Sequence, residues 1–195
     1  MSQEKMKREI EEMTQENADT TKLQQCKDPM KKLQMDVTQI QDSCGKFLWY
    51  IDNWEDKVER GRKRIEKSIS SDPFYSHKNG YKLRLRLEFG VNLFGNDHFS
   101  LRLHILRGEF DNILQWPFRH EVKFDLLNQE TGLPHSSWVL KATDNQNWNG
   151  WKMPSKEENE GIWFNWFIYL SDLQLYPAVC QGNQICIKAT PNITP

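Results

Sequence analysis

The side chains that most often carry catalysis or hold metal ions are scattered along this chain. The histidines show none of the spacings typical of metal ligands, and they lie at His77, His98, His104, His120 and His135. The cysteines form no Cys-x-x-Cys pair, which argues against a zinc knuckle or a thioredoxin-type site, and they are Cys26, Cys44, Cys180 and Cys186. We therefore expect no metal, no cofactor and reduced thiols, although a bridge between Cys180 and Cys186 is geometrically conceivable.

Motifs that position a nucleophile or a phosphate group are missing as well. The chain has no Gly-x-Ser-x-Gly elbow, no phosphate loop and no Gly-x-Gly-x-x-Gly turn. We interpret the acidic segment 157–160 as a hydrophilic loop, and the basic segment 60–64 as a solvated strand or loop face. His104 is expected to be solvated on the polar face of a strand. The sequence therefore predicts no catalytic activity for this chain.

Charge and hydropathy narrow the choice of partner. The formal net charge of −1 over 195 residues gives no global attraction to nucleic acid or anionic membranes. No apolar run approaches the ~20 residues that span a bilayer. Residues 1–8 are polar and have no apolar core like that of a secretory signal. We expect a cytoplasmic protein that neither binds nucleic acid nor inserts directly into a membrane.

Tryptophan is concentrated in one part of the chain, at Trp138, Trp148, Trp151, Trp163 and Trp166. Trp166 lies in an alternating segment and is expected in the core. Trp148 and Trp151 lie in a polar loop, where exposure would indicate a ligand site. Because aromatic rings stack on sugars as well as filling cores, a sugar-binding β-sandwich is an alternative to a peptide-binding one.

The elements that must position these residues fall into two regions with different hydrophobic periods. In residues 1–45, apolar side chains recur at alternating steps of three and four, at Leu23, Cys26, Met30, Leu33, Val37, Ile40 and Cys44. This is the a/d spacing of a coiled-coil seam, whereas a helix that packs on its own domain shows a wider stripe. The pattern predicts an α-helical coiled-coil stalk that self-associates.

From Phe47 onward the period changes to two. Between residues 81 and 89, apolar side chains face one way and charged side chains the other, and similar alternation appears at 99–105, 122–126, 164–170 and 185–187. Turn residues separate these segments, and no helical pattern of ten residues interrupts them. Residues 46–195 are therefore predicted to form a mainly β domain, an antiparallel β-sandwich.

Several motifs of this second region resemble the MATH, or TRAF-C, domain of the tumour-necrosis-factor-receptor-associated factors. They are Phe47-Leu48-Trp49-Tyr50-Ile51, Ser71-Asp72-Pro73-Phe74-Tyr75, Gly108-Glu109-Phe110-Asp111 and Leu114-Gln115-Trp116-Pro117-Phe118, in family order. The resemblance covers roughly residues 47 to 190. The stalk fits as well, because TRAF proteins carry a coiled coil directly before this domain.

The resemblance implies an eight-stranded antiparallel β-sandwich that is trimerised by its stalk. Such domains bind short tails of receptors or adaptor proteins by strand addition in a surface groove. TRAF proteins usually carry a RING and zinc fingers that this chain lacks, so ligase chemistry is not expected in it. The prediction is a homotrimeric signalling adaptor of TNF receptor signalling. A MATH-type substrate adaptor for ubiquitin ligation is the nearest alternative.

The groove residues implied by the resemblance match the family only in part. Arg86 matches the arginine that meets acidic or aromatic ligand groups, Glu88 stands where the family has tyrosine, and Asn92 stands near a family acid. The serine cluster that grips the common acidic-glutamine motif aligns with Trp148, Asn149, Gly150 and Trp151. This departure argues against that motif.

The segment that begins at Gly161 resembles another branch of the family, which reads Pro-x-Glu-x-x-aromatic motifs. Ile162 and Phe164 align without gaps to that branch, which has an aromatic residue at the position of Phe164. We predict that the ligand pairs with the edge segment 160–164, that Gly161 allows close backbone approach, and that Arg86 points outward and is free to contact the ligand.

Overall fold

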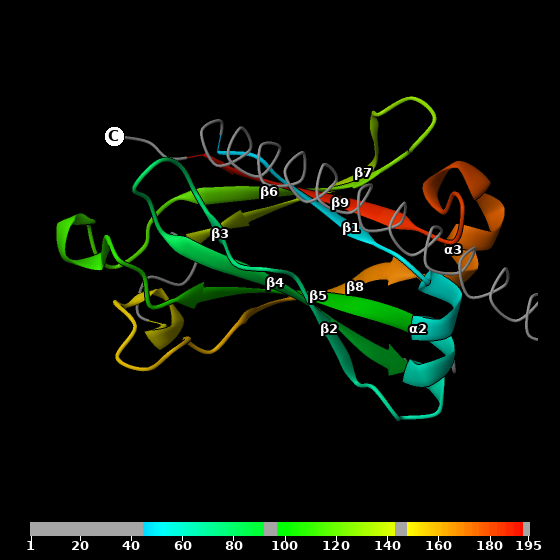
Figure 1. Ribbon diagram of the computed structural model, residues 1–195, viewed down its shortest axis with the longest axis horizontal. Helices are drawn as coiled ribbons and strands as arrows, with labels where there is room; N and C mark the ends of the chain where they lie inside the picture. Colours follow the sequence, from blue (N-terminus) through cyan, green and yellow to red (C-terminus); the bar gives the residue numbers. More distant parts are fainter. Residues whose placement is uncertain (1–44, 92–96, 143–147, 193–195) are drawn as a thin grey trace, which may run out of the picture. The chain divides into compact units, whose positions relative to one another are not determined.

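The computed structural model describes residues 45–91, 97–142 and 148–192 (Figure 1). The predicted seam from Leu23 to Cys44 lies outside these residues, so the stalk and the trimer stay predictions. Asn92, expected in the groove, also lies outside them.

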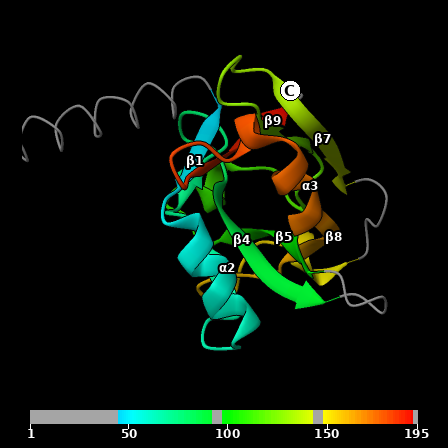
Figure 2. The same ribbon diagram turned by 90° about the vertical axis from the view of Figure 1, so that its right-hand side faces the viewer.

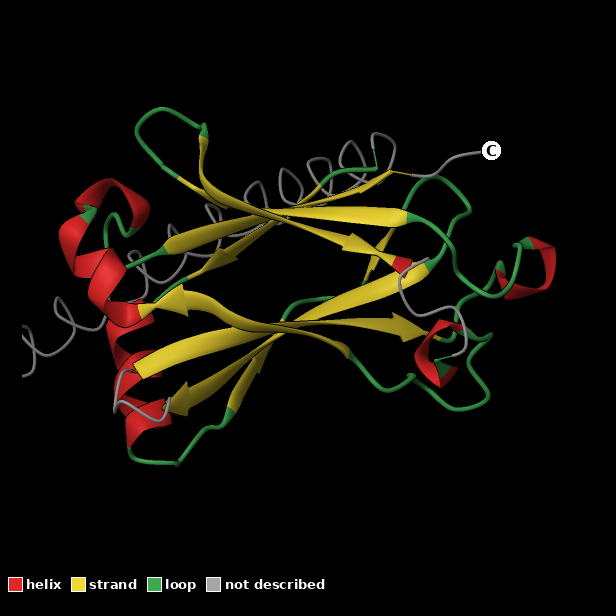
Figure 3. Cartoon of the chain, turned by 180° about the vertical axis from the view of Figure 1, so that it is seen from behind, coloured by secondary structure: helices red, strands yellow, loops and turns green. Residues whose placement is uncertain are grey.

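Two antiparallel sheets form the β-domain, as the alternation predicted. The four-stranded sheet has the order β1-β9-β6-β7, with strands Phe47–Ile51, Ile185–Asn192, Glu121–Leu127 and Pro134–Lys141. The five-stranded sheet has the order β2-β4-β5-β8, and β3 also pairs with β4. Its strands are β2 Ser68–Ser70, β3 Phe74–Tyr75, β4 Lys82–Val91, β5 Asp97–Leu106 and β8 Ile162–Tyr169. Figure 3 shows the two sheets facing each other as layers.

The number of strands differs from the predicted eight, because nine are present in the described part of the chain. The short strands β2 and β3 both pair with β4, at Arg86–Glu88 and at Lys82–Leu83 respectively. Pro73 lies between them, and proline has no N–H for a sheet hydrogen bond. The chain that pairs with this side of β4 is therefore divided into two short strands.

Two short helices close one end of the sandwich, which the sequence did not predict (Figure 2). They are α2, Trp54–Arg62, and α3, Leu170–Leu175. The basic segment 60–64, predicted as a strand or loop face, instead begins in the last turn of α2. There Arg60 and Arg62 are favourably placed at the negative end of the helix dipole. Only Trp54, Val58 and Gly61 of this helix are buried, which is too short a pattern to reveal a helix.

Single-turn 3₁₀ helices lie in connecting loops that the structure describes. They are η1 Asp111–Ile113, η3 Asn149–Trp151 and η4 Pro177–Val179. The η4 turn leads to Cys180, and both Cys180 and Cys186 are free thiols. The conceivable bridge between them is therefore not formed. Burial raises the pKa of the Cys186 thiol to about 11, which keeps it protonated.

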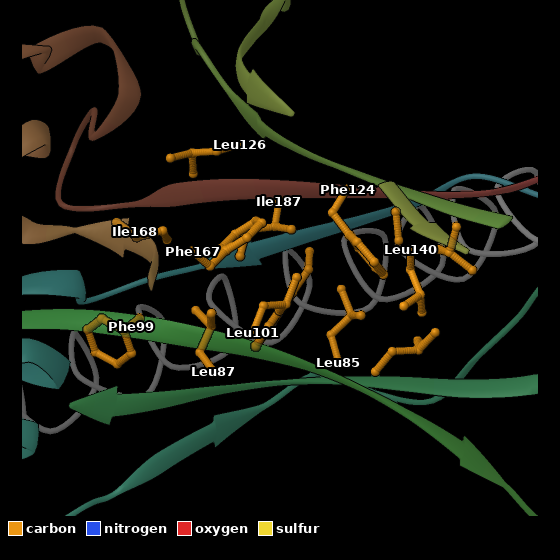
Figure 4. Close-up of a cluster of buried hydrophobic side chains, with 14 of the residues drawn as sticks. Leu85, Leu87, Phe99, Leu101, Phe124, Leu126, Leu140, Phe167, Ile168 and Ile187 are labelled. Carbon is orange, nitrogen blue, oxygen red and sulfur yellow. The ribbon is translucent and has the colours of Figure 1, made fainter. Parts of the chain in front are cut away.

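The core lies between the two sheets and follows the predicted alternation. Leu83, Leu85 and Leu87 of β4 are fully buried, and Phe124 of β6 and Ile187 of β9 are buried on the opposite sheet. Figure 4 shows Leu85, Leu87, Phe124 and Ile187 between the two layers. The alternate residues of β4 are left on the outer face of the five-stranded sheet, and they include the predicted ligand-binding residues Arg86 and Glu88.

Candidate peptide-binding surface

The strand β8 forms an edge of the five-stranded sheet, as the predicted site requires. Among the described strands it pairs with β5 alone, with Leu101 opposite Phe164 and Arg102 opposite Trp163. The pairing continues before β8, where Asn159 N–H donates to the Ile105 carbonyl over 2.9 Å and Arg107 N–H to the Glu157 carbonyl over 2.9 Å. One edge thus runs from residue 157 to residue 164.

The side chains of this edge divide between two faces. Ile162 and Phe164 share the face of the buried β5 leucines and pack against the core, and the Phe164 ring lies edge-on to Phe124, with centroids 5.1 Å apart. Trp163 is 46% exposed on the outer face. The sequence reasoning missed Trp163 as a site residue. Alternation could have found it, since the neighbour of an inward side chain points outward.

A row of three outer-face residues leads across the sheet to this edge. Arg86 of β4 is in register with Arg102 of β5, which is in register with Trp163 of β8. The Arg102 guanidinium lies 3.1 Å from the centroid of the Trp163 ring, a cation–π contact. Glu88, another predicted site residue, lies on the same face, and its Oε1 is 3.0 Å from Arg102 Nε.

Arg86 points outward as predicted, but it is not free. Its Nη2 is 3.0 Å from Glu158 Oε1, and its Nε donates to Ser70 Oγ over 3.2 Å. The second oxygen of the same carboxylate, Oε2, lies 3.2 Å from Arg84 Nη1. Glu158, expected in a solvated loop, is therefore the partner of two arginines.

His104 is buried, with 3% of its surface exposed, and the prediction that it is solvated is wrong. Its Nδ1 lies 3.2 Å from the Asn159 carbonyl oxygen. Burial and the nearby charge of Arg86 lower the pKa of His104, so the neutral ring donates from Nδ1 to that carbonyl.

Gly161 explains why His104 is buried although it lies on the outer, polar face of its strand. A Cβ on Gly161 would lie 2.4 Å from His104 Nε2, so the missing side chain makes room for the imidazole ring. The sequence predicts that Gly161 allows the close approach of a ligand backbone, and this packing gives the glycine a separate role within the domain.

The aligned tryptophan segment forms the η3 turn and is largely packed. Trp151 is 2% exposed and stacks on Phe118 with centroids 5.6 Å apart. The ring of Trp148 occupies the space beside Gly150, where a Cβ would lie 1.7 Å from its Cζ3. Asn149 is exposed. The exposure that would have indicated a ligand site at Trp151 is not found, and the side chain of Trp166 lies outside the described features.

The η3 turn nevertheless lies beside the β8 edge. The Asn159 side-chain amide donates to the Gly150 carbonyl over 3.0 Å and to the Lys152 carbonyl over 2.7 Å. A hollow of about 510 Å³ lies between these segments. Its lining includes Asn149, Gly150, Lys152, Met153, Glu158 and Glu160. The structure thus brings the η3 residues and the edge segment to one surface.

Neither a metal centre nor a membrane span was found in the part of the chain that the structure describes. No group of three or more His, Cys, Asp or Glu side chains there could hold a metal ion. No helix among those residues is long and apolar enough to cross a membrane.

The fold and these motifs agree with a known family. The family model for the TRAF/meprin MATH domain matches residues 66–188. The chain belongs to this family. Within the MATH domain, the match runs from just before β2 into β9 and therefore includes the β8 edge and the outer-face arginines.

Curated relatives of this MATH domain are TRAF proteins. TNF receptor-associated factor 5 of Mus musculus is 34% identical over 124 residues, which are 62% of this chain and 22% of the relative. TNF receptor-associated factor 1 of Homo sapiens is 43% identical over 86 residues, 44% of this chain and 21% of the relative. The chain spans about a fifth of the length of these relatives.

A solved structure, TRAF5 of Notothenia coriiceps, shows the same fold. It matches with a TM-score of 0.70 at 22% identity and covers 98% of this chain and 96% of its own. The predicted TRAF-family MATH domain is therefore confirmed.

Proposed function

We propose that this chain is a signalling adaptor that binds short, extended peptide segments by strand addition along the edge 157–164. The observation that carries this proposal is the position of β8, an edge strand beside an outer face that holds Trp163 and paired arginines. A sheet edge offers backbone N–H and C=O groups to an added strand, and neighbouring side chains then select its sequence.

The names of the relatives suggest the partners. They are TNF receptor-associated factors, so we propose the cytoplasmic tails of such receptors, or of adaptor proteins, as the source of the peptide. The predicted groove residues Arg86 and Glu88 support this role because they lie on the outer face beside the edge, and Gly161 lies in the edge itself. The side chain of Phe164 packs toward the core, so this residue would contribute to an added strand through its backbone. We further propose that the chain contributes binding rather than catalysis.

Trimerisation through the predicted seam would give the weak single site its useful strength. One peptide on a shallow edge binds weakly, but three linked sites on a clustered receptor gain affinity by effective concentration, by about 10²-fold or more. A substrate adaptor for ubiquitin ligation would use the same edge and needs no such seam.

A sugar-binding role is less well supported by this surface. Trp163 is an exposed tryptophan on this surface. One face of its ring is covered by Arg102, which leaves less of the open aromatic platform that sugar stacking needs. A glycan array that binds the wild-type chain while receptor-tail peptides do not would favour the sugar-binding alternative.

Calorimetry with two peptide series tests the proposal, one with Pro-x-Glu-x-x-aromatic sequences and one with acidic-glutamine sequences. We expect the first series to bind. In a bound strand, alternate amides face the sheet, so N-methylation of one alternate set of peptide amides should abolish binding and methylation of the other set should not.

The matched protein variants are Trp163→Ala on the edge and Leu133→Ala in the loop between β6 and β7, where Leu133 is 65% exposed. Trp163→Ala should weaken binding by about tenfold, or 1.4 kcal/mol, and Leu133→Ala should leave it unchanged. Binding that tolerates methylation at every amide would refute strand addition.

A further inference from the structure

We propose that Arg84 and Arg86 form a carboxylate-binding site that the chain's own Glu158 occupies, and that an acidic side chain of the ligand must displace Glu158 to bind there. The inference rests on the proposed function, because the site adjoins the edge on which the peptide is expected. It assigns to Glu158 the role of an internal competitor that determines specificity.

The geometry is that of carboxylate recognition. The two oxygens of Glu158 are divided between two guanidinium groups, Oε1 at 3.0 Å from Arg86 Nη2 and Oε2 at 3.2 Å from Arg84 Nη1. The arginines are two positions apart on β4 and therefore share its outer face. Arginine donors in such forks match carboxylates better than most other partners.

The site has donor capacity that Glu158 does not use. Arg84 Nε is buried and has no hydrogen-bond partner. His104 Nδ1 lies 3.7 Å from Glu158 Oε1, but it already donates to the Asn159 carbonyl. The neighbouring acid on this face, Glu88, is paired with Arg102 at 3.0 Å. An incoming carboxylate would therefore meet arginine donors whose present acid partner is Glu158.

Glu158 can leave the arginines without unfolding its segment. Its backbone is held to the end of β5 by a bridge to Leu106 and by the Asn159 N–H bond to the Ile105 carbonyl. A side-chain rotation is therefore sufficient. The side chains of Arg84 and Glu158 are each 29% exposed, and that of Arg86 is 24% exposed, so the displacing group can approach from solvent.

The ion pairs of Glu158 with Arg84 and Arg86 should compete with a ligand carboxylate and should still be displaced by it. Partly exposed ion pairs stabilise proteins only modestly. If Glu158 occupies the site for most of the time, the apparent affinity of an acidic ligand is reduced by the small fraction of free site. Removal of the Glu158 charge should therefore raise that affinity by about three- to tenfold.

The test compares Glu158→Gln with the matched control Glu157→Gln. Glu157 is an exposed neighbour, and the acid paired with Arg84 and Arg86 is Glu158, so the control removes the same charge and leaves that pairing intact. Calorimetry measures the dissociation constant of a peptide that carries one Asp or Glu near the arginines, and that of the same peptide with Asn or Gln in its place. We expect Glu158→Gln to strengthen binding of the acidic peptide about three- to tenfold, with no change for the neutral peptide and no change in Glu157→Gln.

A second readout does not depend on strand addition. The backbone N–H signals of Leu85, Leu87 and Arg102, which adjoin Arg84 and Arg86 in the sheet, are followed by NMR while N-acetylglutamate N-methylamide is added to each variant. The probe should shift these signals at lower concentration in Glu158→Gln than in the wild type, and Arg84→Ala/Arg86→Ala should remove the difference.

The two readouts separate failure of this inference from failure of the proposed function. If peptides bind but Glu158→Gln favours acidic and neutral peptides equally, the internal competitor is refuted and the adaptor function stands. If no peptide binds while the small carboxylate still prefers Glu158→Gln, the adaptor function fails and the carboxylate site stands. A probe that binds the wild type and Glu158→Gln alike refutes the site.

Discussion

Substituting Gly161 tests whether this glycine serves the buried imidazole beneath it. In Gly161→Ala the new Cβ would lie 2.4 Å from His104 Nε2 and 2.6 Å from Cε1, so the ring has to move. His104 is 3% exposed and has little room. Overpacking of this kind costs about 1–3 kcal/mol. Gly161 is not among the glycines with positive φ, so backbone strain does not add to the penalty.

The double variant makes this prediction specific. His104→Ala removes the ring that the new methyl group meets, so Gly161→Ala should cost about 1–2 kcal/mol less in that background than in the wild type. Urea unfolding of the two single variants and the double variant gives the coupling. Gly132→Ala is the control, because that glycine has nothing within 4 Å and a φ of +68°, so its cost of about 1 kcal/mol comes from conformation alone. Additive effects of Gly161→Ala and His104→Ala would refute the packing role.

Three further outcomes are expected. Phe164→Ala should lower the free energy of unfolding by about 2–4 kcal/mol because its ring packs on the core, whereas Trp163→Ala should lower it by at most about 1 kcal/mol; equal losses in urea titrations would contradict this division of faces. Burial lowers the pKa of both His104 and His120, so the native state binds fewer protons than the unfolded state; stability should fall as the pH drops below the unfolded value of about 6.5, and a flat profile down to about pH 5 would contradict it. Light scattering should show a trimer for the wild type. Charged substitutions at Leu33, Val37 and Ile40 in the predicted seam should make the chain monomeric, since unpaired buried charge is costly.

The hydrophobic period predicted the sheets better than it predicted the polar site. Alternation along residues 81–89 correctly separated the core face of β4 from its outer face, because a strand turns successive side chains to opposite sides. It failed within β8, where a register shift opposite Phe99–Leu101 lets Phe167 and Ile168 both be buried. A bulge of this kind depends on the partner strand, so the segment alone does not reveal it.

The state of individual polar residues depends on contacts between distant parts of the chain. His104 alternates as an outer-face residue should, yet it is buried because Gly161 has no side chain. Arg86 points outward as predicted, yet it is paired with Glu158, which comes from a loop far along the sequence. The hydrophobic period of a strand identifies the face on which a side chain lies. The partners of that side chain depend on which distant segments the fold brings beside it.

The internal pairing of this surface also predicts how binding responds to salt. An acidic ligand that displaces Glu158 exchanges one ion pair with Arg86 for another, so screening weakens the competitor and the ligand together. The dissociation constant of an acidic peptide for the wild type should therefore change little between about 50 mM and about 500 mM salt. In Glu158→Gln the ligand gains an ion pair with no competitor to lose, so the same increase in salt should weaken binding more strongly. Calorimetry at several salt concentrations measures both slopes. A wild-type slope as steep as that of Glu158→Gln would show that the ligand carboxylate binds without displacing Glu158.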